Sequence, residues 1–223
     1  MKISSIIEAA YKLPDKFYAL ECGACSPQYI ETEDWRRKHE VWLLEPNLEV
    51  YNQLKSLDYK VLNLALSDNN QKQTFYISKY EGFCYLESSS LNDSKKNNEQ
   101  ELLSYEVECI TYKNLQKKLG IIYDIFILDI EGQEDRVLKN LLTIEKKYLP
   151  KILCVECGYE WEDRKEICKK LGYNLDFYYY NNAYFSLCNT FTKDINTIET
   201  YNKSWPNWDY NGKRIYDNEN TNI

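Results

Sequence analysis

Short apolar stretches of strand length alternate with stretches of helical periodicity along most of the chain, and this alternation limits the fold more than any other feature. We predict strands at residues 16–22, 41–44, 60–66, 74–78, 105–111, 123–130 and 151–157, and helices at 4–12, 27–40, 46–54, 114–119, 134–148 and 163–171. A hairpin is predicted over residues 175–188. Such an alternation is typical of an α/β fold, with a mostly parallel sheet and helices on both faces.

The length of 223 residues suits one domain. We expect this domain to span residues 1–189, and a polar, partly ordered extension to follow over residues 190–223. For Trp205 and Trp208 in that extension, three interpretations stay open: the core, the contact of a homo-oligomer, or stacking on a sugar ring.

No stretch approaches the ~18 apolar residues that a membrane helix needs. The start of the chain is too short and too acidic for a signal peptide, so we expect a soluble cytoplasmic protein. The net charge is −7, and the basic residues come in pairs or threes that suit solvated helix faces. Broad binding to DNA or RNA needs clustered Lys and Arg, and is therefore disfavoured.

The eight cysteines allow two interpretations. Cys22/Cys25 and Cys154/Cys157 have the C-x-x-C spacing of zinc ligands. Both pairs, however, lie in or at the end of apolar strands and lack the tight glycine turns of zinc knuckles. We favour buried free thiols that pack as small apolar groups.

Ligands of parallel α/β sheets bind beyond the carboxyl ends of the strands. The segments that follow the predicted strands are Glu21-Cys22-Gly23-Ala24, Glu45-Pro46-Asn47, Ala65-Leu66-Ser67-Asp68, Asp129-Ile130-Glu131-Gly132 and Glu156-Cys157-Gly158. Four of these five segments contain Glu and the other contains Asp68. We therefore expect a functional site where these acidic strand ends meet.

The ligand class follows from two of these residues. Gly23 permits close backbone approach to a ligand. Glu45 ends the second strand, where nucleoside-binding folds place the acid that accepts hydrogen bonds from ribose hydroxyls. Because the chain has neither G-x-G-x-x-G nor a phosphate-binding Lys loop, a pyrophosphate ligand is disfavoured. S-adenosylmethionine, a cationic nucleoside without phosphate, suits an acidic site.

At this point the chain resembles the FkbM-type S-adenosylmethionine-dependent methyltransferases over about residues 17–185. The resemblance rests on ECGA (21–24), LLEPNLEVYNQL (43–54), NLALSD (63–68), SSL (89–91), VECITYKNL (107–115), DIFILDIEGQEDRVLKNL (124–141) and ILCVECG (152–158). One position departs from the family's usual G-A-N-x-G turn, because Pro27 stands in place of its last glycine.

The resemblance implies a class I methyltransferase fold, a Rossmann-like seven-stranded sheet whose last strand is antiparallel. It also implies an enzyme that methylates a hydroxyl of a sugar or glycan precursor. Gly23 and Ala24 would line the methionine part of the cofactor, and Glu45 would hold the ribose. Leu66 would flank the adenine and Asp129 would face the methyl donor. The other strand-end residues Glu21, Pro46, Asn47 and Ser67 are candidate cofactor contacts, and Ser89 and Ser90 are candidate acceptor contacts.

Methyl transfer to oxygen requires a base, and His39, the only histidine, lies at the opposite end of the predicted strands. The candidate bases are therefore Asp129, Glu131 and Glu156. Asp129 and Glu156 also resemble the metal-binding acids of catechol-type O-methyltransferases, so a Mg²⁺ that acidifies the hydroxyl is the alternative mechanism.

Two alternative functions stay open. An RNA 2′-O-methyltransferase would need a basic acceptor groove. A non-catalytic scaffold would have kept the fold and lost cofactor binding. Pro27 is the residue that keeps this alternative open.

We also expect residues 87–101 to form a polar loop over the acceptor.

Overall fold

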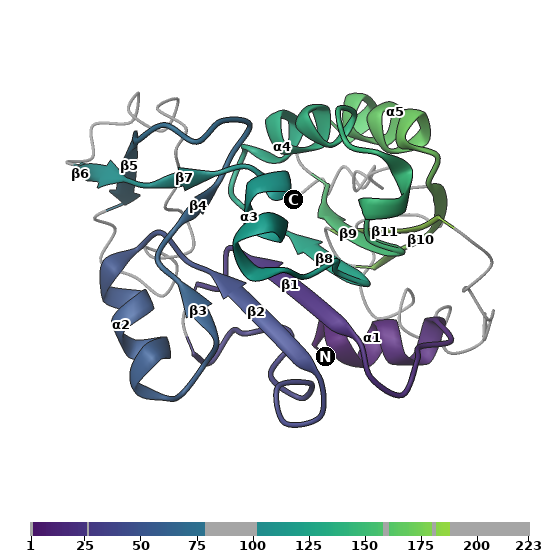
Figure 1. The fold of residues 1–223 in the computed structure, drawn as a ribbon, viewed down its shortest axis with the longest axis horizontal. Helices are drawn as coiled ribbons and strands as arrows, with labels where there is room; N and C mark the ends of the chain where they lie inside the picture. Colours follow the sequence, from purple (N-terminus) through teal and green to yellow (C-terminus); the bar gives the residue numbers. More distant parts are fainter. Residues whose placement is uncertain (1, 26, 79–101, 158–160, 180–181, 188–223) are drawn as a thin grey trace, which may run out of the picture.

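The computed structural model describes residues 2–25, 27–78, 102–157, 161–179 and 182–187. A single large sheet forms its centre, in the order β3-β2-β1-β8-β9-β11-β10 (Figure 1). Its strands are β1 (Tyr18–Cys22), β2 (Glu40–Leu44), β3 (Val61–Leu62), β8 (Ile125–Leu128), β9 (Ile152–Glu156), β10 (Asn174–Tyr179) and β11 (Asn182–Ser186). The strand β11 runs antiparallel to both of its neighbours, whereas β3, β2, β1, β8 and β9 pair in parallel. The predicted seven-stranded, mostly parallel sheet with an antiparallel C-terminal hairpin is confirmed.

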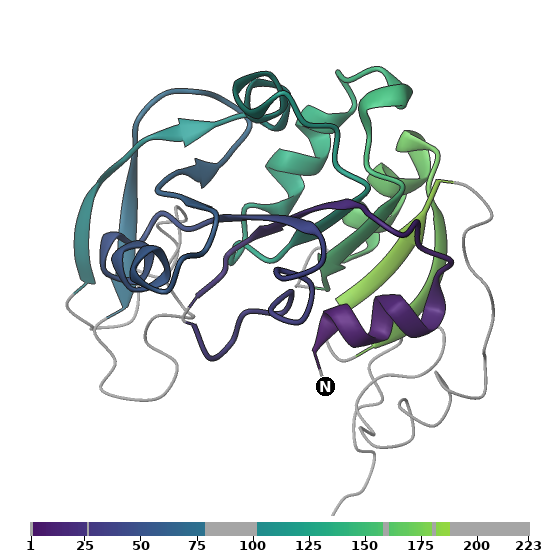
Figure 2. The ribbon, with the colours of Figure 1, turned by 60° about the horizontal axis from the view of Figure 1, so that its bottom comes forward.

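Helices cover both faces of this sheet (Figure 2). The helices α1 (Ile3–Ala10) and α2 (Leu48–Ser56) pack on one face, where the strands contribute Ala19, Ile125 and Ile127. The opposite face carries α3 (Tyr112–Leu119), α4 (Glu134–Leu141) and α5 (Trp161–Leu171), packed on Leu20, Phe126 and Leu153. Because successive strand residues point to opposite faces, these apolar strands can serve two cores at once. No helix among the described residues is long and apolar enough to cross a membrane.

Two small two-stranded sheets lie beyond β3. One pairs β4 (Ala65–Leu66) with β7 (Cys109–Ile110) in parallel, and the other pairs β5 (Gln73–Ser78) with β6 (Leu102–Val107) antiparallel. The prediction of one strand over residues 60–66 is therefore wrong. The Asn63 side chain donates to the carbonyls of Glu45 and Pro46, each at 2.9 Å, and holds the chain at the end of β2. Beyond it, the Ala65 amide donates to Glu108 instead of to the main sheet.

The predicted helix over residues 27–40 is also wrong. The described residues of this segment form consecutive turns. The amides of Glu31 and Thr32 donate to the buried carboxylate of Glu21, at 2.9 and 3.1 Å, so they are not available for helical bonds. The predicted helix 134–148 ends early, at Leu141, and a 3₁₀ turn (Lys146–Tyr148) follows it.

Candidate active site

Strand register places four of the predicted residues in one row. Cys22 of β1 is level with Leu44 of β2 and with Leu128 of β8, and Leu128 is level with Val155 of β9. The next residue on each strand is Gly23, Glu45, Asp129 and Glu156, respectively. Because these strands are parallel, the four residues meet at one edge of the sheet, as the sequence predicts.

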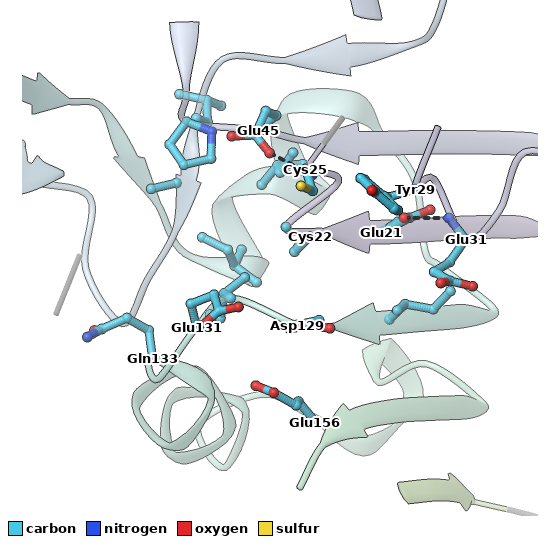
Figure 3. Close-up of a pocket in the computed structure, with 18 of the residues that line it drawn as sticks. Glu21, Cys22, Cys25, Tyr29, Glu31, Glu45, Asp129, Glu131, Gln133 and Glu156 are labelled. Atoms are coloured by element: carbon cyan, nitrogen blue, oxygen red, sulfur yellow. Dashed lines mark hydrogen bonds between the residues drawn. The ribbon is translucent and has the colours of Figure 1, made fainter. Parts of the chain in front are cut away.

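A cleft of about 300 Å³ opens at this edge (Figure 3). It is lined by Ile3, Glu21, Cys22, Gly23, Cys25, Tyr29, Glu31, Leu44, Glu45, Pro46, Leu64, Ala65, Leu66, Phe75, Ile127, Asp129, Ile130, Glu131, Gln133 and Glu156. These lining residues include six carboxylic acids and neither Lys nor Arg. Among the described residues, the cleft is therefore strongly acidic and suits a cationic ligand.

Gly23 lets the ends of β1 and β8 approach each other. Its φ is +86°, and a Cβ at this position would lie 1.6 Å from the carbonyl oxygen of Asp129. Its amide donates to the carbonyl of Leu44 at 3.2 Å. The close approach that the sequence assigned to a ligand is thus, in the structure, an approach to the backbone of Asp129.

Glu45 fixes the loop that follows β1. It is 4% exposed, and its two carboxylate oxygens accept from the amides of Cys25 at 3.0 Å and Asn47 at 2.7 Å. Burial raises the pKa of Glu45 to about 8, although these two amide hydrogen bonds act in the opposite direction. Cys25 has φ +51°, so its amide reaches Glu45 from a left-handed turn.

Glu21 has a different part in the site. Its carboxylate accepts from the Glu31 and Thr32 amides and from the Thr32 hydroxyl, and burial raises its pKa to about 7. These bonds hold the segment that carries Tyr29 and Glu31 against the cleft. Figure 3 shows this group on one side of Asp129, with Glu156 on the other.

The end of the cleft beyond β2 is apolar. Leu64, Ala65, Leu66 and Phe75 line it, and Leu66 is the residue that the resemblance implies would flank the adenine. Ser67 does not line the cleft: its hydroxyl accepts from the Gln73 side chain at 2.8 Å. An aromatic base could lie flat against this apolar wall.

A cluster of carboxylates lies at the ends of β8 and β9. Carboxylate oxygens of Asp129, Glu134 and Glu156 lie within 4.8 Å of one another. Burial, together with Glu156 and Glu131, raises the pKa of Asp129 well above its usual range. Glu131, with φ +56°, also faces the cleft. A carboxyl group that is so disposed can hold or accept a proton near neutral pH.

Glu134, the fully buried member of this cluster, has three hydrogen-bond donors around it. One of its oxygens accepts from the Ile130 amide at 2.8 Å, and the other from Gly132 at 3.0 Å and from Arg164 at 3.0 Å. Mg²⁺ prefers near-octahedral oxygen ligands. Here the residues present would offer it Asp129 and Glu156, while Glu134 could join only by giving up these contacts.

The structure brings together most of the predicted site, but not all of it. Asn47 is the N-cap of α2, where its side chain accepts from the amides of Glu49 and Val50, and Ala24 packs in the core beneath α1. Neither lines the cleft. Ser89, Ser90, the loop 87–101 and the two tryptophans Trp205 and Trp208 lie outside the described residues.

Several lining residues were not predicted. Tyr29 and Glu31 were assigned to a helix, and Phe75 to a strand at residues 74–78. Gln133 could have been found, because it lies within the D-x-E-G-x-E segment. Of the cysteines in the described residues, Cys22, Cys109, Cys154, Cys157 and Cys168 are buried free thiols, as expected, while Cys25 is half-buried.

The strand order and the antiparallel β11 are those of the class I methyltransferase fold, and the cleft lies at the ends of β1, β2 and β8. The family model described as the methyltransferase FkbM domain matches residues 21–185. The chain belongs to this family.

The solved structures that resemble this chain have low sequence identity to it. Precorrin-6y C5,15-methyltransferase from Geobacter metallireducens is 10% identical with a TM-score of 0.44, over 82% of this chain and 85% of that chain. A TehB-like SAM-dependent methyltransferase from Corynebacterium glutamicum is 12% identical with a TM-score of 0.44, over 82% and 85%. The fibrillarin pre-rRNA processing protein of Methanococcus jannaschii is 14% identical with a TM-score of 0.41, over 82% and 71%. None of the curated proteins matches the sequence significantly.

Proposed function

We propose that this methyltransferase acts on a hydroxyl group of a sugar or glycan precursor, with a carboxylate of the cleft as the general base. The observation that carries the proposal is the position of Asp129 and Glu156 at the ends of adjacent strands, beside the cleft. S-adenosylmethionine supplies an electrophilic methyl group on a sulfonium centre when it is bound.

The cleft suits this cofactor in charge. Burial raises the pKa of several of its lining acids, and the positive charges of the sulfonium and ammonium groups would favour the ionised forms of these acids. Glu45 would accept hydrogen bonds from the ribose, Leu66 and Phe75 would contact the adenine, and Gly23 would line the methionine part. Pro27 lies in a turn beyond Cys25. The hydrogen bond from the Cys25 amide to Glu45 holds the loop that precedes Pro27 in place.

Asp129 is the candidate base with the most suitable surroundings. A carboxylate with an ordinary pKa near 4 is a weak acceptor for a hydroxyl proton, and a raised pKa makes it a better one. Burial and the neighbouring acids act in this direction on the pKa of Asp129. His39 does not line the cleft, and its ring stacks on Phe17 with centroids 3.7 Å apart.

Direct action of the carboxylate is the mechanism we propose, in preference to assistance by Mg²⁺. Glu134 would have to give up its contacts with two amides and with Arg164 to bind a metal ion. The neighbouring acids Glu156 and Glu131 would raise the affinity of Asp129 for the proton that it receives.

The sugar acceptor is inferred from the family, whose members often modify saccharides. An RNA acceptor is less well supported. Among the described residues the cleft is lined by acids, and neither Lys nor Arg lines it to bind phosphate groups. A scaffold without cofactor is also less well supported, since the strand-end residues are assembled around the cleft.

The experiment is a methyl-transfer assay with labelled S-adenosylmethionine against sugars, nucleotide sugars and RNA. We expect transfer to a sugar hydroxyl, and a loss of about 10²–10⁴-fold in kcat for Asp129→Asn, the range of general-base catalysis. Glu108→Gln is the control, because Glu108 pairs with Lys72 on the surface and does not line the cleft. Full activity of Asp129→Asn, or transfer to RNA alone, would contradict the proposal.

A further inference from the structure

A buried arginine lies directly behind the acidic strand ends. Arg164 of α5 is 5% exposed and does not line the cleft. Its Nη2 contacts Glu134 at 3.0 Å, its Nε donates to Asp135 at 2.5 Å, and its Nη1 donates to the carbonyl of Glu156 at 2.7 Å. One guanidinium group therefore joins α5 to the start of α4 and to the end of β9.

The Glu134 partner of Arg164 shapes the loop that carries the candidate base. Glu134 is fully buried and accepts from the amides of Ile130 and Gly132, at 2.8 and 3.0 Å. Between these amides lies Glu131, with φ +56°, and Gly132 follows with φ +97°. A non-glycine residue in this region is strained, so the loop needs contacts that hold it.

The Glu134 carboxylate accepts three hydrogen bonds, two from backbone amides and one from Arg164. Arg164 supplies the positive charge that this buried carboxylate requires. Burial would lower the pKa of Arg164, but Glu134 and Asp135 outweigh it and raise that pKa above its ordinary value. Arg164 therefore stays charged.

We propose that Arg164 is a positioning residue for methyl transfer, which acts through Glu134 to fix the loop 129–132 and directly to fix the end of β9 at Glu156. It thereby sets the distance between the carboxyl groups of Asp129 and Glu156. This inference rests on the proposed function of those two residues. It concerns the acceptor side of the cleft, because Arg164 contacts Glu134, Asp135 and Glu156.

Arginine suits this position better than lysine. The planar guanidinium donates in three directions, to two carboxylates and one carbonyl, whereas an ammonium group on a flexible stem cannot match this fork. The variant Arg164→Lys keeps the charge and most of the volume while it loses the geometry. It is therefore the sharpest test.

The test measures two properties of Arg164→Lys. The first is the hydrogen exchange of the Ile130 and Gly132 amides, which needs neither cofactor nor acceptor. The second is kcat, counted per S-adenosylmethionine site titrated by calorimetry, together with the dissociation constant of the cofactor. Gln116→Met is the control, because Gln116 is also buried and donates to a backbone carbonyl, that of Tyr148, away from the cleft.

We expect faster exchange at both amides and a decrease in kcat of about 10–100-fold, since a misplacement of about 1 Å has effects of this size. The affinity for the cofactor should change much less. Gln116→Met should lower the melting temperature without either effect. Unchanged exchange and unchanged kcat in Arg164→Lys would overturn the inference.

A second variant covers the case in which Arg164→Lys does not fold. Glu134→Gln keeps the shape but replaces one acceptor oxygen by an NH₂ group, so it should free one of the two amides and lower kcat similarly. If the wild-type protein transfers no methyl group to any acceptor, the proposed function fails. The amide exchange then still decides whether Arg164 holds the loop, and unchanged exchange in both variants would overturn that part.

Discussion

Substitution of Gly23 by alanine tests the geometry of the site most severely. Gly23 has φ +86°, and its missing Cβ would lie 1.6 Å from the Asp129 carbonyl oxygen and 2.8 Å from its carbonyl carbon. Both are backbone atoms, so the clash cannot be relieved by rotation of a side chain. In Gly23→Ala the ends of β1 and β8 must therefore move apart, at the centre of the large sheet.

The magnitude can be estimated from a second glycine. Gly120 has φ +70°, but nothing lies within 4 Å of its Cβ position. Gly120→Ala should therefore lower the free energy of unfolding only by the cost of an alanine in a left-handed conformation, about 1–2 kcal/mol. Gly23→Ala should add the cost of overpacking, about 1–3 kcal/mol. The total of about 2–5 kcal/mol is a large part of the 5–15 kcal/mol by which domains of this kind are stable.

Urea unfolding of the two variants and the wild type measures these free energies. We expect a clearly lower midpoint for Gly23→Ala than for Gly120→Ala, at a similar slope. The cofactor affinity of Gly23→Ala should also fall, because Gly23 lines the cleft and Gly120 does not. Equal destabilisation of the two variants would refute the close packing of Gly23 on Asp129.

Three further predictions concern pH, metal and the apolar wall. Burial raises the pKa of Glu45 to about 8 and that of Glu21 to about 7. The folded protein therefore holds protons that the unfolded chain releases near pH 4–5, so the free energy of unfolding should fall between pH 5 and 9. Constant urea midpoints over this range would contradict the prediction. Turnover should survive exhaustive dialysis against a chelator, whereas a loss that added Mg²⁺ restores would favour the metal mechanism. Phe75→Ala should weaken calorimetric binding of S-adenosylmethionine by about 0.5–1.5 kcal/mol if the ring contacts the adenine, and unchanged binding would contradict that contact.

The sheet was predictable because its signals are local. The apolar runs at β1, β2, β8 and β9 are continuous, as buried parallel strands require. Each run ends at a glycine or an acidic residue. Parallel pairing then places Gly23, Glu45, Asp129 and Glu156 in one row, so the centre of the site followed from the strand ends alone.

The remaining parts depend on side chains that are distant in sequence. The turns around Glu31 and Thr32 replace a helix because the carboxylate of Glu21, ten residues earlier, takes their amides. The division of residues 60–66 into two strands depends on Asn63 and on pairing of Ala65 with the strand at Cys109. Neither contact has a periodic signal in the sequence.

Contacts between side chains that are distant in sequence also explain why the roles of Asn47 and Arg164 were not predicted. Asn47 was a candidate cofactor contact because it follows Glu45, yet it caps α2, which is a common role of asparagine before a helix. Arg164 could not be connected to Asp129 or Glu156 from the sequence, because the packing of α5 on α4 brings them together.

We propose that the cleft at the ends of β1, β2 and β8 holds S-adenosylmethionine, and calorimetric titration of this cofactor is the decisive measurement. Glu45→Ala removes the carboxylate that would bind the ribose, and Glu49→Ala, an exposed residue in the first turn of α2, is the matched control. We predict micromolar binding, about −8 kcal/mol, in the wild type and in Glu49→Ala, and its loss in Glu45→Ala. Absence of binding by the wild type at millimolar cofactor, or equal affinity of all three proteins, would contradict the account.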